Sequence, residues 1–266
     1  MPPMSEMADK QLSFWEHLDV LRRALFRLLG VWLVLAVGYF VLMPSLFDAV
    51  VLAPCRDDFC FYGLLRRMAA WMGSDSPFLT AEFHLKLINI NLTAPFFIHL
   101  STAFWLSVVT AVPYLLYEVW RFIAPALYPS EQRGVRKALW LGSVMFYLGV
   151  LLGYFMVYPL TLRFLSTYQL SAAIETQISL NSYIDNFMML ILCMGLAFEL
   201  PLLTWLLSLL GVVNRGFLRK YRRHAIVLIV ILAAIITPTG DPFTLAVVAI
   251  PLCLLYELSI LLTRLR

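Results

Sequence analysis

Six long apolar runs constrain the fold of this chain more than any other feature of its sequence. A helix perpendicular to the membrane needs about 20 apolar residues to cross the hydrocarbon core. The sequence is 62% apolar and 14% charged, whereas soluble domains are about 45–50% apolar and about 25% charged. We therefore predict an all-α polytopic membrane protein, residues 1–266 forming one domain with six transmembrane helices. The predicted spans are Ala24–Met43, Ala94–Tyr117, Ala138–Leu160, Asn186–Val213, Ala225–Thr237 and Thr244–Leu262.

Two of these runs depart from a simple span. The fifth run, Ala225–Thr237, is too short for a normal bilayer, so we expect thinner membrane or shielding neighbours around it. The fourth run contains Pro201 near its middle, which predicts a bend. Before the fourth run, Ser182 and Asp185 have the spacing of a capping box that would begin its helix.

The basic residues predict how the chain is oriented. Six spans put both termini on one side, and 15 of the 20 Lys and Arg residues fall in segments on that side. The positive-inside rule then makes the termini cytoplasmic. The cytoplasmic segments are residues 1–23, 118–137 and 214–224, and residues 44–93 form the largest periplasmic loop. Because the periplasm is oxidising, we expect a disulfide between Cys55 and Cys60 in that loop.

Catalytic and metal-binding motifs are absent from the sequence. The four histidines lack the H-E-x-x-H spacing of a zinc protease, and there is no phosphate-binding P-loop. We therefore predict no enzyme activity, no metal and no cofactor. Glu199 lies inside the fourth run, where a carboxyl is costly and usually faces a bundle interior, a partner or a wet cavity. The alternative is a protonated Glu199 bonded to a neighbouring helix. Glu118, at the end of the second run, is interpreted as an interfacial anchor.

Several segments resemble one known family. They are His17-Leu-Asp-Val-Leu-Arg22, Glu118-Val-Trp-Arg-Phe122-Ile-Ala-Pro125-Ala-Leu-Tyr128-Pro-Ser-Glu131, Gly195-Leu-Ala-Phe-Glu199-Leu-Pro201, Thr237-Pro-Thr-Gly-Asp241 and Ile250-Pro251 with Leu255-Tyr256-Glu257. In this order they resemble motifs of TatC, the multispanning receptor subunit of the twin-arginine protein translocase. The resemblance covers nearly the whole chain.

The resemblance implies a concave bundle that binds the paired arginines of signal peptides on folded passenger proteins. It also implies single-span partners like TatA and TatB, and transport driven by the proton-motive force. By motif position, the signal-binding residues are Arg22, Phe122 and Glu131. Glu199 is then the polar group of the concave face. The positions implied for partner contact and assembly are Pro54, Thr237 and Asp241.

Val20 stands where the family's N-terminal motif has a Glu, and two nearby acids, Glu16 and Asp19, could replace it. Helix geometry ranks the candidates, because Glu16 lies one turn before position 20 whereas Asp19 points about 100° away. Asp19 is also positioned to pair with Arg23 four residues later. We therefore rank Glu16 above Asp19, although Glu16 also has capping-box spacing with Ser13.

Two other functions fit the same composition. An ion-coupled small-molecule transporter would use Glu199 as its proton site, but the chain shows no inverted repeat. An assembly scaffold without a ligand would not need Phe122 and Glu131 on a cytosolic loop.

Overall fold

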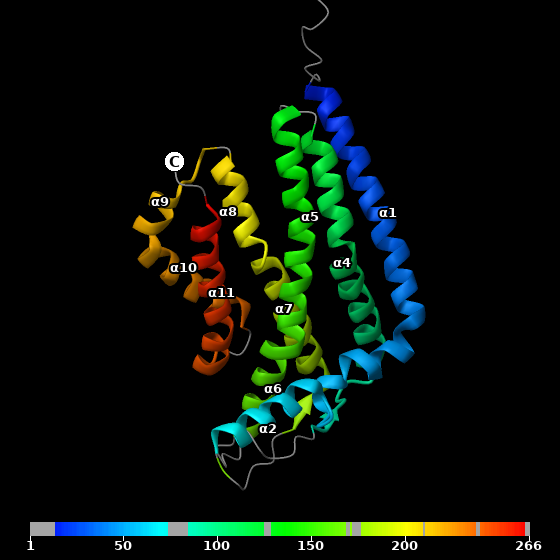
Figure 1. The fold of residues 1–266 in the computed structure, drawn as a ribbon. Helices are drawn as coiled ribbons and strands as arrows, with labels where there is room; N and C mark the ends of the chain where they lie inside the picture. The colour runs from blue at the N-terminus through cyan, green and yellow to red at the C-terminus, as the bar shows by residue number, and fades with distance from the viewer. Residues whose placement is uncertain are drawn as a thin grey trace, which may run out of the picture.

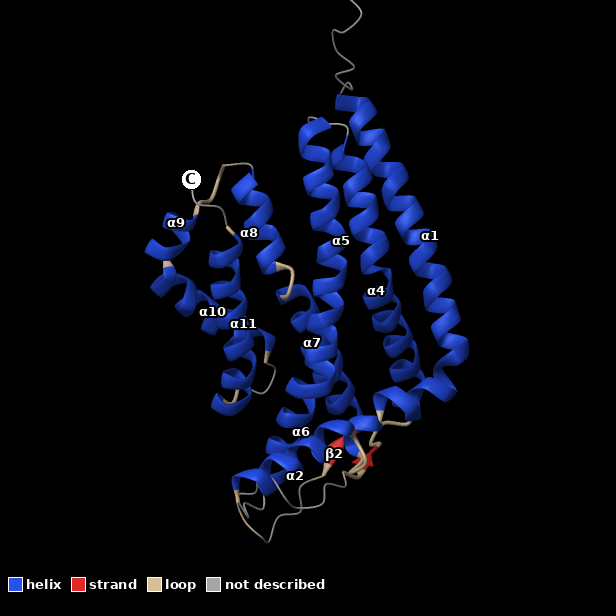
Figure 2. Cartoon of the chain, in the orientation of Figure 1, coloured by secondary structure: helices blue, strands red, loops and turns tan. Residues whose placement is uncertain are grey.

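The computed structural model describes residues 14–73, 85–124, 129–168, 171, 177–209, 211–237 and 240–263. Within this part of the chain almost everything is helix (Figure 2). The strands are a parallel pair of two residues each, β1 (Leu87–Ile88) and β2 (Ile178–Ser179). The all-α class predicted from the sequence is confirmed.

The helices follow the predicted apolar runs. The long ones are α1 (Phe14–Leu46), α4 (Ala94–Ile123), α5 (Pro129–Leu152), α7 (Leu180–Ala197) and α11 (Pro242–Leu262). A π-helical turn, η4 (Gly153–Val157), joins α5 to α6 (Tyr158–Thr167). The shorter elements are η1 (Phe47–Val51), η2 (Ala53–Cys55), α2 (Cys60–Met72), α8 (Leu200–Leu209), α9 (Arg215–Lys220) and α10 (Arg222–Ile236).

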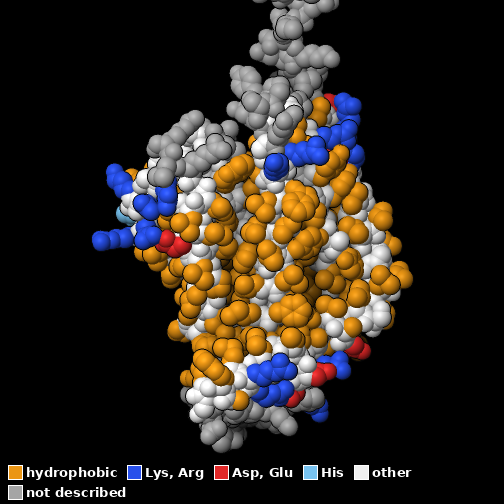
Figure 3. All heavy atoms as spheres, in the orientation of Figure 1, with side chains coloured by type: hydrophobic (Ala, Val, Ile, Leu, Met, Phe, Trp, Pro, Cys, Tyr) orange, Lys and Arg blue, Asp and Glu red, His pale blue; other side chains and the backbone are white. Residues whose placement is uncertain are grey.

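The described helices have the length, composition and surface of a membrane protein. Five stretches are long and apolar enough to cross a bilayer: Leu18–Met72, Ala94–Ile123, Gly134–Thr167, Leu180–Ser208 and Pro242–Leu262. Hydrophobic side chains cover the middle of the molecule, and charged ones gather towards its two ends (Figure 3). The short fifth run forms α10, which has 15 residues, so a sixth span remains a prediction.

The bundle has two different ends. α1 begins and α11 ends at the same end, whereas α2 lies across the opposite end (Figure 1). α1 packs along α4, α5 packs against α7, and α11 packs against α8 and α10. We call the end with the start of α1 the terminal end, and the end with α2 the cap end.

The connecting segments contain more helix than the predicted boundaries imply. α4 and α5 both continue into segment 118–137, and α9 lies inside segment 214–224. The predicted loop 44–93 contains η1, η2 and α2. The fourth span begins at Leu180, capped by Ser179, whose hydroxyl accepts from the Ser182 N–H at 3.3 Å. The predicted Ser182 capping box was therefore wrong by about one turn.

A break interrupts the fourth span where Pro201 was expected to bend it. α7 ends at Ala197 and α8 begins at Leu200, so Pro201 occupies the first turn of the second helix. Proline is tolerated there because first-turn N–H groups have no intrahelical acceptor. The predicted bend is confirmed, and Glu199 lies in the break.

A second proline shapes the cap end of α1. Proline has no N–H, so Pro44 cannot donate the regular helical hydrogen bond to the carbonyl of Phe40. His99 of α4 donates instead, with its Nε2 2.7 Å from the Phe40 oxygen. Its ring also stacks on the Phe40 ring, with centroids 4.2 Å apart. This contact joins α1 to α4 near the cap end.

Glycines allow α5 and α7 to approach closely. A Cβ on Gly149 would lie 2.5 Å from the backbone oxygen of Met194, and a Cβ on Gly195 would lie 2.8 Å from the Phe146 ring. Small residues serve this purpose in membrane helix interfaces, where packing rather than the hydrophobic effect holds helices together.

Tyrosine hydroxyls fix the cap end by donating to backbone oxygens of the chain between α1 and α2. Tyr62 donates to Pro54 at 2.7 Å, Tyr154 to Val50 at 2.8 Å and Tyr183 to Val51 at 2.5 Å. Buried carbonyls without such donors would be costly. These contacts hold the cap end against η4 and α7.

The predicted disulfide is absent from the structure. Cys55 and Cys60 are both free thiols, the first buried and the second exposed. The physical reason lies in the local fold. Cys55 packs into the hydrophobic core of the cap end, whereas Cys60 is the first residue of α2 and faces outward.

Candidate functional site

The terminal end gathers the predicted signal-binding residues on three elements. Phe122 lies in the last turn of α4 and is partly buried. Glu131 is the third residue of α5, and Glu16 is the third residue of α1. The side chains of these two glutamates lie outside the described part of the structure. Gln132 ties α5 back to α4, because its Nε2 donates to the Ala124 carbonyl at 3.0 Å.

Asp19 binds two arginines of its own helix. Its carboxylate lies 2.6 Å from Arg22 Nη2 and 2.5 Å from Arg23 Nη2. The predicted pairing of Asp19 with Arg23 is confirmed, and Arg22 joins it. Both guanidinium groups are largely exposed, at 69% and 64%, so each pair contributes little to stability and can exchange partners.

One turn further along α1, Arg27 forms a bidentate ion pair with Glu118 of α4. Arg27 Nε lies 2.9 Å from Oε1, and Arg27 Nη2 lies 2.7 Å from Oε2. The Tyr114 hydroxyl donates to the same Oε1 at 2.8 Å. Glu118 is buried and pairs with Arg27 of another helix, a contact that its interpretation as an interfacial anchor did not include. This triad fixes the terminal end of α1 against α4, next to the candidate site.

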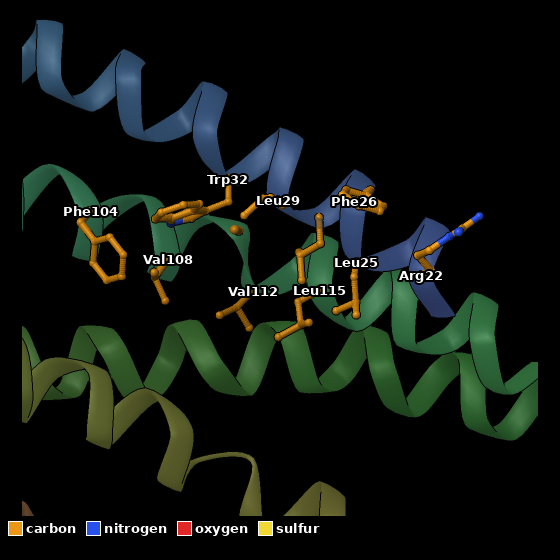
Figure 4. A pocket seen from close by; sticks show the side chains of 11 residues that line it. Arg22, Leu25, Phe26, Leu29, Trp32, Phe104, Val108, Val112 and Leu115 are labelled. Atoms are coloured by element: carbon orange, nitrogen blue, oxygen red, sulfur yellow. The ribbon is translucent and has the colours of Figure 1, made fainter. Parts of the chain in front are cut away.

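An apolar groove of about 630 Å³ runs between α1 and α4 below the arginines. Figure 4 shows Leu25, Leu29 and Trp32 of α1 on one side of it, with Val112 and Leu115 among the residues of α4. Arg22 lies at one end of the groove, pointing outward (Figure 4). Arg22 therefore places a positive charge at one end of the apolar groove.

Glu199 lies against α5. A Cβ on Gly142 would come within 2.9 Å of Glu199 Oε2, so the two helices are close at this point. The carboxyl is half-buried, and its Oε1 has no hydrogen-bond partner among the described residues. An orphan polar atom inside a bundle is costly, and this supports a role for Glu199 beyond packing.

The residues predicted for partner contact form local hydrogen bonds near the cap end. Asp241 is the N-cap of α11 and accepts from the Thr244 N–H at 2.8 Å. Thr237 is buried and donates its hydroxyl to the Ala233 carbonyl at 2.9 Å. Pro54 is buried, and its carbonyl accepts from Tyr62. Partner contact by these residues remains a prediction.

The sequence analysis did not predict that Glu118 is buried or that Arg27 and Tyr114 bind it. The available signal was a charge on each of two neighbouring apolar runs, because such charges are usually paired inside a membrane. In the part of the chain that the structure describes, no cluster of three His, Cys, Asp or Glu residues could hold a metal ion.

These features define a helical, multi-pass membrane protein with a charged site at the terminal end of its bundle. The family model for the Sec-independent protein translocase protein (TatC) matches residues 16–251. The chain belongs to the TatC family. It is a multi-pass protein of the inner membrane and a component of protein transport.

Relatives and solved structures match nearly the whole chain. TatC of Blattabacterium sp. subsp. Periplaneta americana (strain BPLAN) is 33% identical over 94% of both chains. TatC of Koribacter versatilis (strain Ellin345) is 35% identical over 97% of this chain and 87% of its own. Two crystal structures of the twin-arginine translocase receptor TatC match with TM-scores of 0.71 and 0.73. They are 32% and 31% identical, and cover 92% and 94% of this chain and 97% and 100% of their own.

Proposed function

We propose that this protein is the receptor of a twin-arginine translocase and binds signal peptides at the terminal end of its bundle. The observation that carries the proposal is the meeting of α1, α4 and α5 at that end. The end of α4 supplies Phe122, the start of α5 supplies Glu131, and α1 supplies Arg22 and Asp19. An aromatic ring and carboxylates together suit a peptide with paired arginines beside an apolar segment.

The chemistry favours arginine over lysine in the peptide. A guanidinium is a planar fork that a carboxylate accepts through two parallel hydrogen bonds, whereas an ammonium is a point charge. Glu131 is our candidate for one such carboxylate. Asp19 already neutralises Arg22 and Arg23, so a peptide arginine must compete for it. The ranking of Glu16 above Asp19 therefore rests on helix geometry, because Glu16 lies one turn before position 20.

The orientation follows from the same proposal. The terminal end faces the cytoplasm, and the cap end faces the periplasm. Support comes from the basic residues, most of which belong to segments at the terminal end. A reporter fused after Arg266 that is active only in the periplasm should then be silent, and activity would contradict this orientation.

The partners proposed for this receptor are single-span subunits like TatA and TatB, with transport driven by the proton-motive force. Glu199 is proposed as the polar group that the bundle presents to the signal peptide or to a partner. Its Oε1 has no hydrogen-bond partner among the described residues, and this supports the role. Glu199→Gln keeps a polar group and should keep transport, whereas Glu199→Leu should reduce it. Normal transport by the Leu variant would remove Glu199 from the mechanism.

The direct test compares two peptides that differ only in an Arg-Arg or a Lys-Lys pair. Their affinities for the purified full chain are measured by fluorescence anisotropy. Glu131→Gln should weaken Arg-Arg binding about tenfold to a hundredfold, because it removes a charge-assisted hydrogen bond of about 1.5–3 kcal/mol. The matched control is Glu257→Gln, which removes an exposed carboxylate that pairs with Arg222. Equal effects of the two variants would contradict the proposed site.

The second acid is identified by the same assay. Glu16→Gln should weaken Arg-Arg binding more than Asp19→Asn does. The Gln side chain keeps the hydrogen-bonding capacity of a capping residue, so a loss would reflect the missing charge. If only Asp19→Asn weakens binding, the ranking is wrong.

A further inference from the structure

A second groove lies between α4 and α5 and has no part in the proposed function. It encloses about 480 Å³. Three aromatic side chains form much of its wall: Tyr117 and Trp120 of α4 and Trp140 of α5. Arg136 and Ser143 of α5 add a guanidinium and a hydroxyl to the lining.

Arg136 is the only charged residue lining this groove in the described structure. Its side chain is exposed, and it forms no ion pair with any side chain that the structure describes. In this respect it differs from Arg22 at the α1–α4 groove, whose guanidinium is paired with Asp19 at 2.6 Å. The α4–α5 groove therefore offers a cation that is available to an anionic ligand.

The aromatic residues place the groove at the level of lipid headgroups. Trp140 is 71% exposed and Tyr117 is 55% exposed, although both are large and amphipathic. Trp and Tyr concentrate at membrane–water interfaces, where an apolar ring and a polar tip are both accommodated. Basic pockets between transmembrane helices at this level suit anionic headgroups.

We propose that the α4–α5 groove binds one anionic phospholipid, of the class of phosphatidylglycerol, from the leaflet at the terminal end. Arg136 contacts the phosphate. The rings of Tyr117, Trp120 and Trp140 flank the glycerol region, and the first part of an acyl chain lies towards Ser143.

The dimensions of the groove favour a lipid over a transmembrane helix of a partner. Its walls extend over eight residues of each helix, from Pro113 to Trp120 and from Arg136 to Ser143, which is seven residue-to-residue steps. At 1.5 Å per residue this is about 10 Å, a third of the roughly 30 Å hydrocarbon core. Its volume also lies within the range of about 300–1,000 Å³ that single small ligands occupy. A partner helix would need a surface along the full membrane thickness.

The test measures lipid binding and not transport, so its outcome is independent of the proposed receptor function. The purified full chain in detergent is titrated with phosphatidylglycerol or with zwitterionic phosphatidylcholine, and bound lipids are counted by native mass spectrometry. One cation near an anionic headgroup contributes about 1 kcal/mol, so we expect roughly a fivefold preference for phosphatidylglycerol. Arg136→Gln should abolish this preference, and Arg136→Lys should keep most of it.

Lys137→Gln is the matched control. Lys137 is the next residue, is also exposed and does not line the groove, yet its loss changes the net charge equally. It should leave the preference unchanged. The proposal is overturned if Arg136→Gln keeps the preference, or if Lys137→Gln loses it to the same extent. Ser143→Phe should fill the groove and weaken both lipids. If it leaves lipid binding intact but abolishes binding of a single-span partner, the groove is a helix site and the proposal is wrong.

Discussion

Replacing Gly149 with alanine tests whether the close approach of α5 and α7 holds the bundle together. The new Cβ would lie 2.5 Å from the Met194 backbone oxygen, about 0.9 Å short of the 3.4 Å at which ordinary contact begins. A backbone atom cannot rotate away, so the two helices must separate. Overpacking of this kind costs about 1–3 kcal/mol, and we expect the upper part of that range. Alanine favours the helix over glycine by about 1 kcal/mol. The net loss in the free energy of unfolding is then about 1–2 kcal/mol.

The assay is thermal unfolding of the purified chain in detergent. For a chain of this size, 1 kcal/mol shifts Tm by about 2–4 °C, so Gly149→Ala should lower Tm by roughly 2–8 °C. Gly38→Ala in α1 is the control, because no atom lies within 4 Å of its added Cβ. It should leave Tm unchanged or raise it. Gly142→Ala should fall between them, since its Cβ meets the ends of the Leu202 and Glu199 side chains, which can move. The reasoning fails if Gly149→Ala is as stable as Gly38→Ala.

Three further predictions concern single contacts of the structure. In the native protein, Cys60 should react with a maleimide within minutes while Cys55 reacts only after unfolding; protection of both thiols would instead reveal the disulfide. Glu118→Leu should lower Tm, because it leaves the Arg27 guanidinium unpaired between two helices, and Arg27→Met in the same chain should restore most of the loss; a double variant no better than the single one would contradict this. Asp241→Ala should cost about 1 kcal/mol through the lost N-cap, measured by thermal unfolding, whereas Asp241→Asn should cost little; equal losses would mean that the charge matters more than the cap.

The apolar runs predicted most of the helices because their signal is local. A run of about 20 apolar residues and a proline at Pro201 each act on their own segment, and the structure follows both. The pairing of Asp19 with Arg23 is equally local, one helical turn apart. Even so, the start of the fourth span was misplaced by about a turn, because more than one serine there could cap a helix.

Contacts between distant segments could not be predicted in the same way. Arg27 and Glu118 are 91 residues apart, and only the packing of α1 on α4 brings them together. The tyrosines of the cap end donate to backbone carbonyls, which every residue possesses and which therefore leave no mark in the sequence. The disulfide predicted between Cys55 and Cys60 was wrong for a similar reason. The spacing of two cysteines carries no information about which thiol the fold buries.

The contact between His99 and Phe40 has a consequence for the order in which the protein enters the membrane. A backbone carbonyl without a hydrogen bond costs several kcal/mol in hydrocarbon, and Pro44 deprives the Phe40 carbonyl of its usual donor. The substitute donor is 59 residues further along the chain. α1 is therefore complete as a membrane-spanning helix only after α4 has entered beside it. The first two spans should leave the insertion machinery as a pair, since the first one alone retains an unsatisfied polar group.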